Sequence, residues 1–188
     1  MVQVPIKLIS IDNFYDIKAL KTKVMIYPTD TVYGIGCSAE NKKLVERIFA
    51  IKGRNRKKPM SVIAPNKEWI LEHCIVSGEI LDKYLPGKYT LLLMKKNPEF
   101  LKHVTANSGT LGVRIPAHPF SKLVEKANIP FVTTSANLSG EKPAKSISEI
   151  PKKVLDAVDL VIDGGALSGI PSAIVDCRSG EDIIIKRA

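Results

Sequence analysis

Cysteine is scarce in this chain, and its few cysteines follow no disulfide or zinc-binding pattern. Cys37, Cys74 and Cys177 are odd in number, lie far apart and include no CxxC pair, whereas zinc sites and disulfide frameworks depend on paired spacings. No run of residues approaches the roughly 18 apolar positions of a membrane-spanning helix. Residues 1–10 do not have the charged, apolar and small-residue zones of a signal peptide. These absences predict a reduced, cytoplasmic protein that does not enter a membrane.

Three widespread catalytic signatures are also missing. The sequence contains no GxxxxGK(S/T) phosphate loop, no GxGxxG after a predicted strand and no GxSxG nucleophile turn. His73, His103 and His118 are too far apart along the chain to show a metal-ligand spacing. The sequence therefore argues against a P-loop NTPase, a dinucleotide-binding enzyme and a serine hydrolase. It leaves the ligands of any metal ion unknown.

Positive charge is in excess. The chain has 28 Lys and Arg against 19 Asp and Glu, a formal net charge of +9, which favours polyanionic partners such as nucleic acids or nucleotide phosphates. A basic surface that serves only solubility explains the same number, so charge alone leaves both interpretations open. With 188 residues, of which 45% are hydrophobic, the chain is predicted to fold as one domain over residues 1–188.

Hydrophobic periodicity predicts an irregular alternation of strands and helices. Strands are predicted at residues 24–27, 60–64, 89–94, 111–115, 130–134, 159–162, 172–177 and 183–185. Helices are predicted at residues 40–52, 68–73, 78–84, 120–127 and 149–157, the last with Ser148 as its N-cap. The last two strands follow each other without a helix. This order predicts an α/β domain with a mixed β-sheet and flanking helices.

Three polar segments follow these predicted elements. Residues 28–34 (PTDTVYG) suit a small polar substrate or a metal–phosphate group, and equally a turn capped by its own side chains. Residues 52–59 contain five cations after a helix, which suit a triphosphate or an RNA backbone, or a solvated helix end. Residues 133–140 (TTSANLSG) gather donors for phosphate or carboxylate oxygens, or form an ordinary turn.

The spelling of five segments resembles the YrdC family. In order, they are PTDTVYGIG (28–36), KGR (52–54), LGVRIPAHP (111–119), TTSANLSGEKPA (133–144) and PSAIVDC (171–177). The resemblance implies a twisted sheet around a concave, basic cavity. It also implies synthesis of L-threonylcarbamoyladenylate from L-threonine, bicarbonate and ATP with Mg²⁺, releasing pyrophosphate. The product would pass to a threonylcarbamoyl transferase that forms threonylcarbamoyladenosine in tRNA.

The resemblance also implies site residues. Those on the L-threonine side are Thr31, Arg114, Thr133 and Ser172. Those on the ATP side are Arg54, Lys58, Thr110, Ser135 and Arg187. The catalytic set implied by the family's KxR and SxN motifs is Lys52, Arg54, Ser135 and Asn137. In this set the two cations would stabilise charge, and Ser135 and Asn137 would orient phosphates or bound metal.

The chain departs from longer relatives of the family at two positions after the KGR segment. Lys58 and Ile63 stand where those relatives carry Asn and His, so a histidine contact to threonine is not expected from this loop. Two other functions remain open. One is an RNA-binding module for double-stranded RNA or tRNA without catalysis, which salt-sensitive binding without ATP turnover would indicate. The other is carbamoyl-adenylate synthesis, as in the similar domain of HypF.

Overall fold

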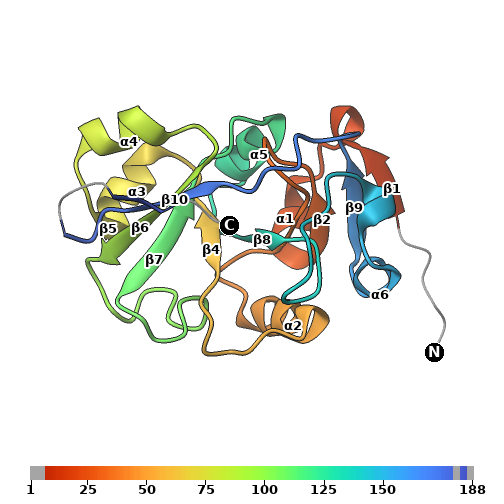
Figure 1. Cartoon of the computed structure of the whole chain (residues 1–188), viewed down its shortest axis with the longest axis horizontal. Coiled ribbons are helices and arrows are strands. Elements are labelled where there is room, and N and C mark those ends of the chain that lie inside the picture. The colour runs from red at the N-terminus through yellow and green to blue at the C-terminus, as the bar shows by residue number, and fades with distance from the viewer. Residues whose placement is uncertain (1–6, 180–182, 186–188) are drawn as a thin grey trace.

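The strands of this protein form one continuous mixed sheet (Figure 1). The computed structural model describes residues 7–179 and 183–185. Within them the sheet order is β1-β9-β2-β3-β8-β4-β7-β6-β10-β11, with β5 paired to β6. The strand bounds are β1 Lys7–Ser10, β2 Met25–Tyr27, β3 Gly34–Gly36, β4 Ser61–Ile63, β5 Cys74–Ile75, β6 Tyr89–Lys95, β7 Thr110–Arg114, β8 Phe131–Ser135, β9 Leu160–Asp163, β10 Ala173–Asp176 and β11 Ile183–Ile185. Pairs β4–β7 and β10–β6 are parallel, whereas β3–β8 and β6–β7 are antiparallel, so the predicted mixed α/β fold is confirmed.

Helices flank this sheet along its length. Figure 1 shows α3 and α4 beside the β5–β6 end and α6 beside β9 at the other end. The helix bounds are α1 Ile17–Thr22, α2 Lys42–Lys52, α3 Lys67–His73, α4 Gly78–Tyr84, α5 Pro119–Ala127 and α6 Lys152–Leu155, with 3₁₀ turns η1 Ile11–Asn13 and η2 Ile147–Glu149. In the part of the chain that the structure describes, no helix has the length and apolar composition needed to span a bilayer.

The core lies on both faces of the sheet. Neighbouring residues of one strand fall in different apolar clusters: Ile26 of β2 packs in one, and Met25 and Tyr27 in the other. This is the two-residue alternation of a strand buried on both sides. Helix α2 joins the first cluster through Ile48, and α5 joins the second through Phe120. The sheet is therefore a rigid support for the loops at its strand ends.

The helix prediction for residues 40–52 is confirmed, with the observed helix beginning two residues later, at Lys42. The side chain of Asn41 accepts a hydrogen bond from the backbone N–H of Leu44 at the start of α2. Gly53 ends the helix in the left-handed conformation, at φ 57°, which glycine adopts without a steric penalty. The end of α2 therefore directs residues 53–59 away from the helix axis.

The predicted helix at residues 149–157 is wrong in its length and its cap. Helix α6 covers only Lys152–Leu155 and begins after Pro151, while Ser148 lies inside the separate turn η2. The cause is local. Ile150 has φ −76° and ψ 128°, the extended conformation that proline imposes on the residue before it. One continuous helix across Pro151 is thereby prevented.

Strand β3 was not predicted, because its sequence, Gly-Ile-Gly, has no strand pattern. Both glycines are needed by close packing. A Cβ on Gly36 would lie 2.0 Å from the backbone oxygen of Val132, and one on Gly34 would lie 2.8 Å from Cζ of Tyr27. Strand β3 pairs with β8, setting Gly34 opposite Ser135. This pairing places residues 28–33 beside the loop that follows β8.

Candidate functional site

The three polar segments that the sequence singled out meet around one cavity of about 380 Å³. Six predicted site residues line it: Thr31, Arg54, Arg114, Thr133, Ser135 and Ser172. The wall also contains Thr29, Val32, Tyr33, Gly34, Pro59, Met60, Ser61, Thr90, Thr134, Pro143 and Pro171. Hydroxyl groups dominate the polar part of the wall, and a guanidinium group stands at each of two positions. Such a lining suits an anionic ligand with several oxygen atoms.

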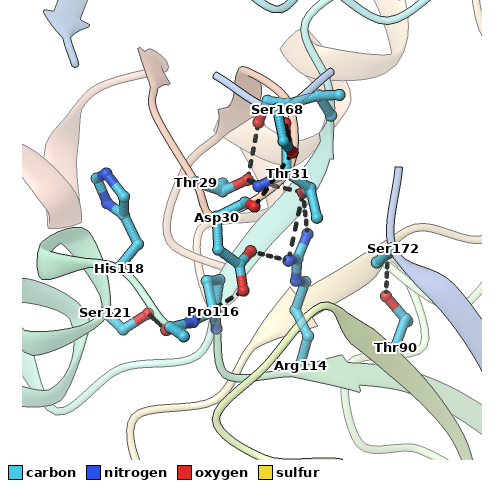
Figure 2. Close-up of polar contacts among 12 residues, drawn as sticks. Thr29, Asp30, Thr31, Thr90, Arg114, Pro116, His118, Ser121, Ser168 and Ser172 are labelled. Carbon is cyan, nitrogen blue, oxygen red and sulfur yellow. Dashed lines mark hydrogen bonds and ion pairs between the residues drawn. The ribbon is translucent and has the colours of Figure 1, made fainter. Parts of the chain in front are cut away.

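One end of the cavity is built around a buried ion pair (Figure 2). Nη2 of Arg114, at the end of β7, lies 2.6 Å from Oδ1 of Asp30, and the two side chains are 7% and 5% exposed. The other carboxylate oxygen of Asp30 accepts a hydrogen bond of 2.9 Å from the backbone N–H of Ala117. Asp30 therefore holds both the end of β7 and the segment after it.

Thr31 completes this end through a chain of hydroxyl groups. The hydroxyl of Thr29 donates its single proton to the backbone oxygen of Val32, at 2.8 Å. The hydroxyls of Thr29 and Thr31 lie 2.9 Å apart, so in this second hydrogen bond Thr31 is the donor and Thr29 the acceptor. The Thr31 oxygen then presents its lone pairs to Arg114, whose Nη1 and Nη2 both lie 3.5 Å away. Thr31 is thus oriented from both sides.

A second hydroxyl pair lies across from this cluster in Figure 2. The hydroxyls of Ser172, just before β10, and Thr90 of β6 are 2.9 Å apart and buried. Thr90 was not among the predicted residues. The signal that could have identified it is a lone threonine near the start of a predicted strand that is otherwise mostly apolar. Parallel pairing of β10 with β6 sets the two side chains next to each other.

The segment between β9 and β10 crosses the front of the molecule (Figure 1) and contacts the loop that contains Thr31. Its Ser168 hydroxyl and Gly169 N–H both donate to the backbone oxygen of Thr31, at 3.1 and 3.0 Å. The Tyr33 hydroxyl donates to the Gly165 oxygen at 2.8 Å. Burial raises the pKa of Tyr33 to about 12, so this phenol stays protonated at neutral pH. The segment is therefore tied to the cavity rim.

A second end of the cavity is lined by Arg54, whose guanidinium donates to the backbone oxygens of Lys58 and Pro59 at 3.2 and 2.7 Å. The Lys58 side chain is exposed and does not line the cavity. Thr110 also lies outside the lining, with its hydroxyl 3.9 Å from Sδ of Met94. Arg187 falls outside the described residues. The structure thus brings Arg54 to the cavity but not Lys58 or Thr110.

Lys52 and Asn137 lie directly behind the cavity wall. The ammonium group of Lys52, 2% exposed as a residue, donates to the backbone oxygens of Ser135 and Asn137 and, at 3.2 Å, to the Asn137 side chain. The Ser135 hydroxyl also donates to the Asn137 side chain. Burial is the main cause that lowers the pKa of Lys52 to about 7, with Arg54 adding to it. The Lys52 nitrogen thus faces three protein oxygens at the end of β8 and in the loop after it, and does not line the cavity.

Among the residues that the structure describes, no three His, Cys, Asp or Glu side chains come together in a group that could hold a metal ion. The cavity wall instead offers hydroxyl oxygens, including those of Ser61, Thr134 and Ser135.

Known proteins resemble this chain in both sequence and fold. The family model Sua5_yciO_yrdC, described as "Telomere recombination", matches residues 18–188. A relative from Methanocaldococcus jannaschii is 37% identical over 178 residues, 93% of this chain and 84% of its own length. The threonylcarbamoyl-AMP synthase of Pseudoalteromonas atlantica is 34% identical over 184 residues, 92% of this chain and 95% of that protein. The crystal structure of Pyrococcus abyssi Sua5 complexed with L-threonine superposes with a TM-score of 0.78 at 27% identity. That match covers 92% of this chain but only 54% of the Sua5 chain.

Proposed function

This chain belongs to the Sua5/YciO/YrdC family, and we infer from its cavity that it is a threonylcarbamoyl-AMP synthase. It would condense L-threonine, bicarbonate and ATP to threonylcarbamoyl-AMP and release pyrophosphate. One observation supports this most directly: Thr31 and Arg114 line the same cavity as Arg54 and Ser135. Two anionic reactants can therefore be held close enough to react.

The amino acid is assigned to the Arg114 end. A guanidinium group pairs with a carboxylate through parallel N–H donors, and Arg114 is fixed beside Thr31 for such a contact. Thr133 and the Ser172–Thr90 pair would supply hydroxyl contacts. Sua5 of P. abyssi, a structural relative, has been crystallised with L-threonine, which supports an amino-acid site in this fold.

ATP is assigned to the Arg54 end. The reaction that needs help is attack of a carbamate oxygen on the α-phosphorus, with pyrophosphate as leaving group. Both reactants are negatively charged, so positioning and fixed positive charge reduce the barrier. Arg54 would offset phosphate charge, and the Ser135 hydroxyl would orient a phosphate oxygen. Lys52 and Asn137 would act through the loop that they hold.

We assign Mg²⁺ to the nucleotide rather than to a protein cage. This ion commonly keeps several waters and is held by few protein ligands together with substrate phosphates. Oxygen donors from Thr134 and Ser135 in the wall fit that requirement. When bound, the ion would neutralise phosphate charge.

The product is an activated acyl-adenylate, so a transferase that delivers the threonylcarbamoyl group to tRNA is the partner we propose. The formal charge of +9 is compatible with direct contact to RNA. A binding module without catalysis is not favoured, because relatives that match most of this chain, such as the one from P. atlantica, are threonylcarbamoyl-AMP synthases.

The function is tested by pyrophosphate release from the purified protein with ATP and Mg²⁺. We expect release only when L-threonine and bicarbonate are both present, together with threonylcarbamoyl-AMP identified by mass spectrometry. Release that continues when either one is omitted would contradict the proposal and indicate ATP hydrolysis or another substrate. Salt-sensitive RNA binding without any turnover would favour the RNA-binding module instead.

A further inference from the structure

We propose that Asp30 is a positioning residue for the amino-acid substrate: its carboxylate sets the guanidinium of Arg114 in the orientation that receives the substrate's carboxylate or carbamate. This inference rests on the proposed function. Asp30 does not line the cavity among the described residues, so it would act through Arg114.

The contacts of Asp30 tie three segments together. Its side chain joins the loop after β2 to Arg114 and to the backbone of Ala117, at 2.6 and 2.9 Å. Its backbone oxygen lies 3.5 Å from the hydroxyl of Ser168, in the segment before β10. Figure 2 shows Asp30 between these groups. A displacement of this carboxylate would therefore disturb both Arg114 and the segment at Ala117.

Distances indicate which contact fixes Arg114. Its Nη atoms lie 3.5 Å from the Thr31 hydroxyl, at the far limit of a hydrogen bond. The contact with Asp30 is 2.6 Å and joins opposite charges, and charge-assisted bonds of that length are the strong ones. Asp30 therefore orients the guanidinium group far more firmly than Thr31 does.

Burial adds a second reason. Both side chains are at most 7% exposed, and a buried guanidinium deprived of its carboxylate is strongly disfavoured. In such a variant Arg114 would turn toward water or another acceptor. Asp30 also offsets part of the positive charge that attracts the substrate, so what it contributes is orientation and not attraction.

A matched control exists elsewhere in the chain. Asp159 also accepts from one arginine and one backbone N–H: Nη1 of Arg47 and the N–H of Val24, each at 2.8 Å. None of these three residues lines the cavity. Replacing Asp159 removes the same kinds of hydrogen bond without touching the substrate end, although this pair is more exposed, at 31% for Asp159 and 39% for Arg47. The variant therefore reports what the loss of an Asp–Arg contact does away from the cavity.

The experiment compares Asp30→Asn and Asp30→Glu with Asp159→Asn. For each, the KM for L-threonine, the KM for ATP and the Tm are measured, and threonine binding is measured by calorimetry without ATP. For Asp30→Asn we expect the threonine KM and Kd to rise at least tenfold and the ATP KM to stay within twofold. Asp159→Asn is expected to lower Tm and leave both KM values within twofold of wild type.

Asp30→Glu keeps the charge but moves the carboxylate by one methylene, and it keeps the test decisive should Asp30→Asn not fold. We expect a near-normal Tm with a threonine KM raised at least threefold. A wild-type threonine KM in either folded variant, or equal losses for threonine and ATP, overturns the inference. If the wild-type protein neither binds threonine nor needs it for turnover, the proposed function itself fails, which is a distinct result.

Discussion

The two ends of the cavity are built differently. At the end that we assign to the amino acid, Arg114 stands at the end of a central strand, is 7% exposed and pairs with a carboxylate that is itself anchored. At the end that we assign to the nucleotide, Arg54 lies in a loop and contacts backbone oxygens of that same loop. The first end is held by buried contacts within the protein, whereas the second depends on a partly buried arginine in a loop. Ordering side chains on binding has an entropic cost, so the first end is the better suited to select a small ligand.

Among the variants that test this difference, Arg114→Ala is expected to have the largest effect on activity. Arg114→Ala removes the carboxylate contact and leaves Asp30 charged and buried, which costs about 3–5 kcal/mol of stability for a buried pair. We expect kcat/KM for threonine to fall at least a hundredfold, about 2.7 kcal/mol, together with a lower Tm. Steady-state assays and thermal unfolding would measure both. An active variant with normal threonine KM would show that this end does not hold the amino acid.

A smaller effect is expected at the nucleotide end. Arg54→Ala should reduce kcat/KM for ATP at least tenfold, about 1.4 kcal/mol, with little change in Tm because Arg54 is only partly buried. Lys58→Ala is the matched control, since its exposed side chain does not line the cavity, and we expect less than a threefold change. Equal losses in the two variants would show that the loop contributes only its total charge.

The last effect concerns the pH dependence of stability and not catalysis, and it is expected at Lys52, which holds the loop after β8. Its pKa is about 7 in the folded protein, against about 10.4 when unfolded. Between these values the unfolded chain binds a proton that the folded chain does not. The free energy of unfolding should therefore rise with pH from about 7 to about 10.

This slope is measured by denaturant unfolding of the wild type and Lys52→Met at several pH values. We expect the wild type to gain stability relative to Lys52→Met as the pH rises. As a control, Lys42→Met changes an exposed position of the same helix, and the difference in stability between the wild type and this variant should stay constant with pH. A difference between wild type and Lys52→Met that is constant with pH would contradict the assignment.

The sequence predicted correctly those elements whose conformation depends mainly on their own residues. Helix α2 follows from its apolar spacing, and it ends at Lys52 as predicted. Helix α4 has the predicted bounds, Gly78–Tyr84. The polar segments were found because their residues adjoin in sequence, and their family resemblance came from the same adjacency. Patterns failed where a neighbour intervenes: β3 is a strand because β2 and β8 lie on either side of it.

By itself, the sequence determined most of the elements, the excess of positive charge and the segments that carry the chemistry. Only the tertiary structure decided which of those side chains face a ligand. Asp30 meets Arg114 across 84 residues of chain, and Lys52 meets the loop after β8 across 83 and 85 residues. Contacts between such distant residues depend on strand order and register, which a linear pattern does not encode. For that reason Lys52, predicted to stabilise substrate charge, is directed to protein oxygens, while the unassigned Asp30 holds the arginine of the amino-acid end.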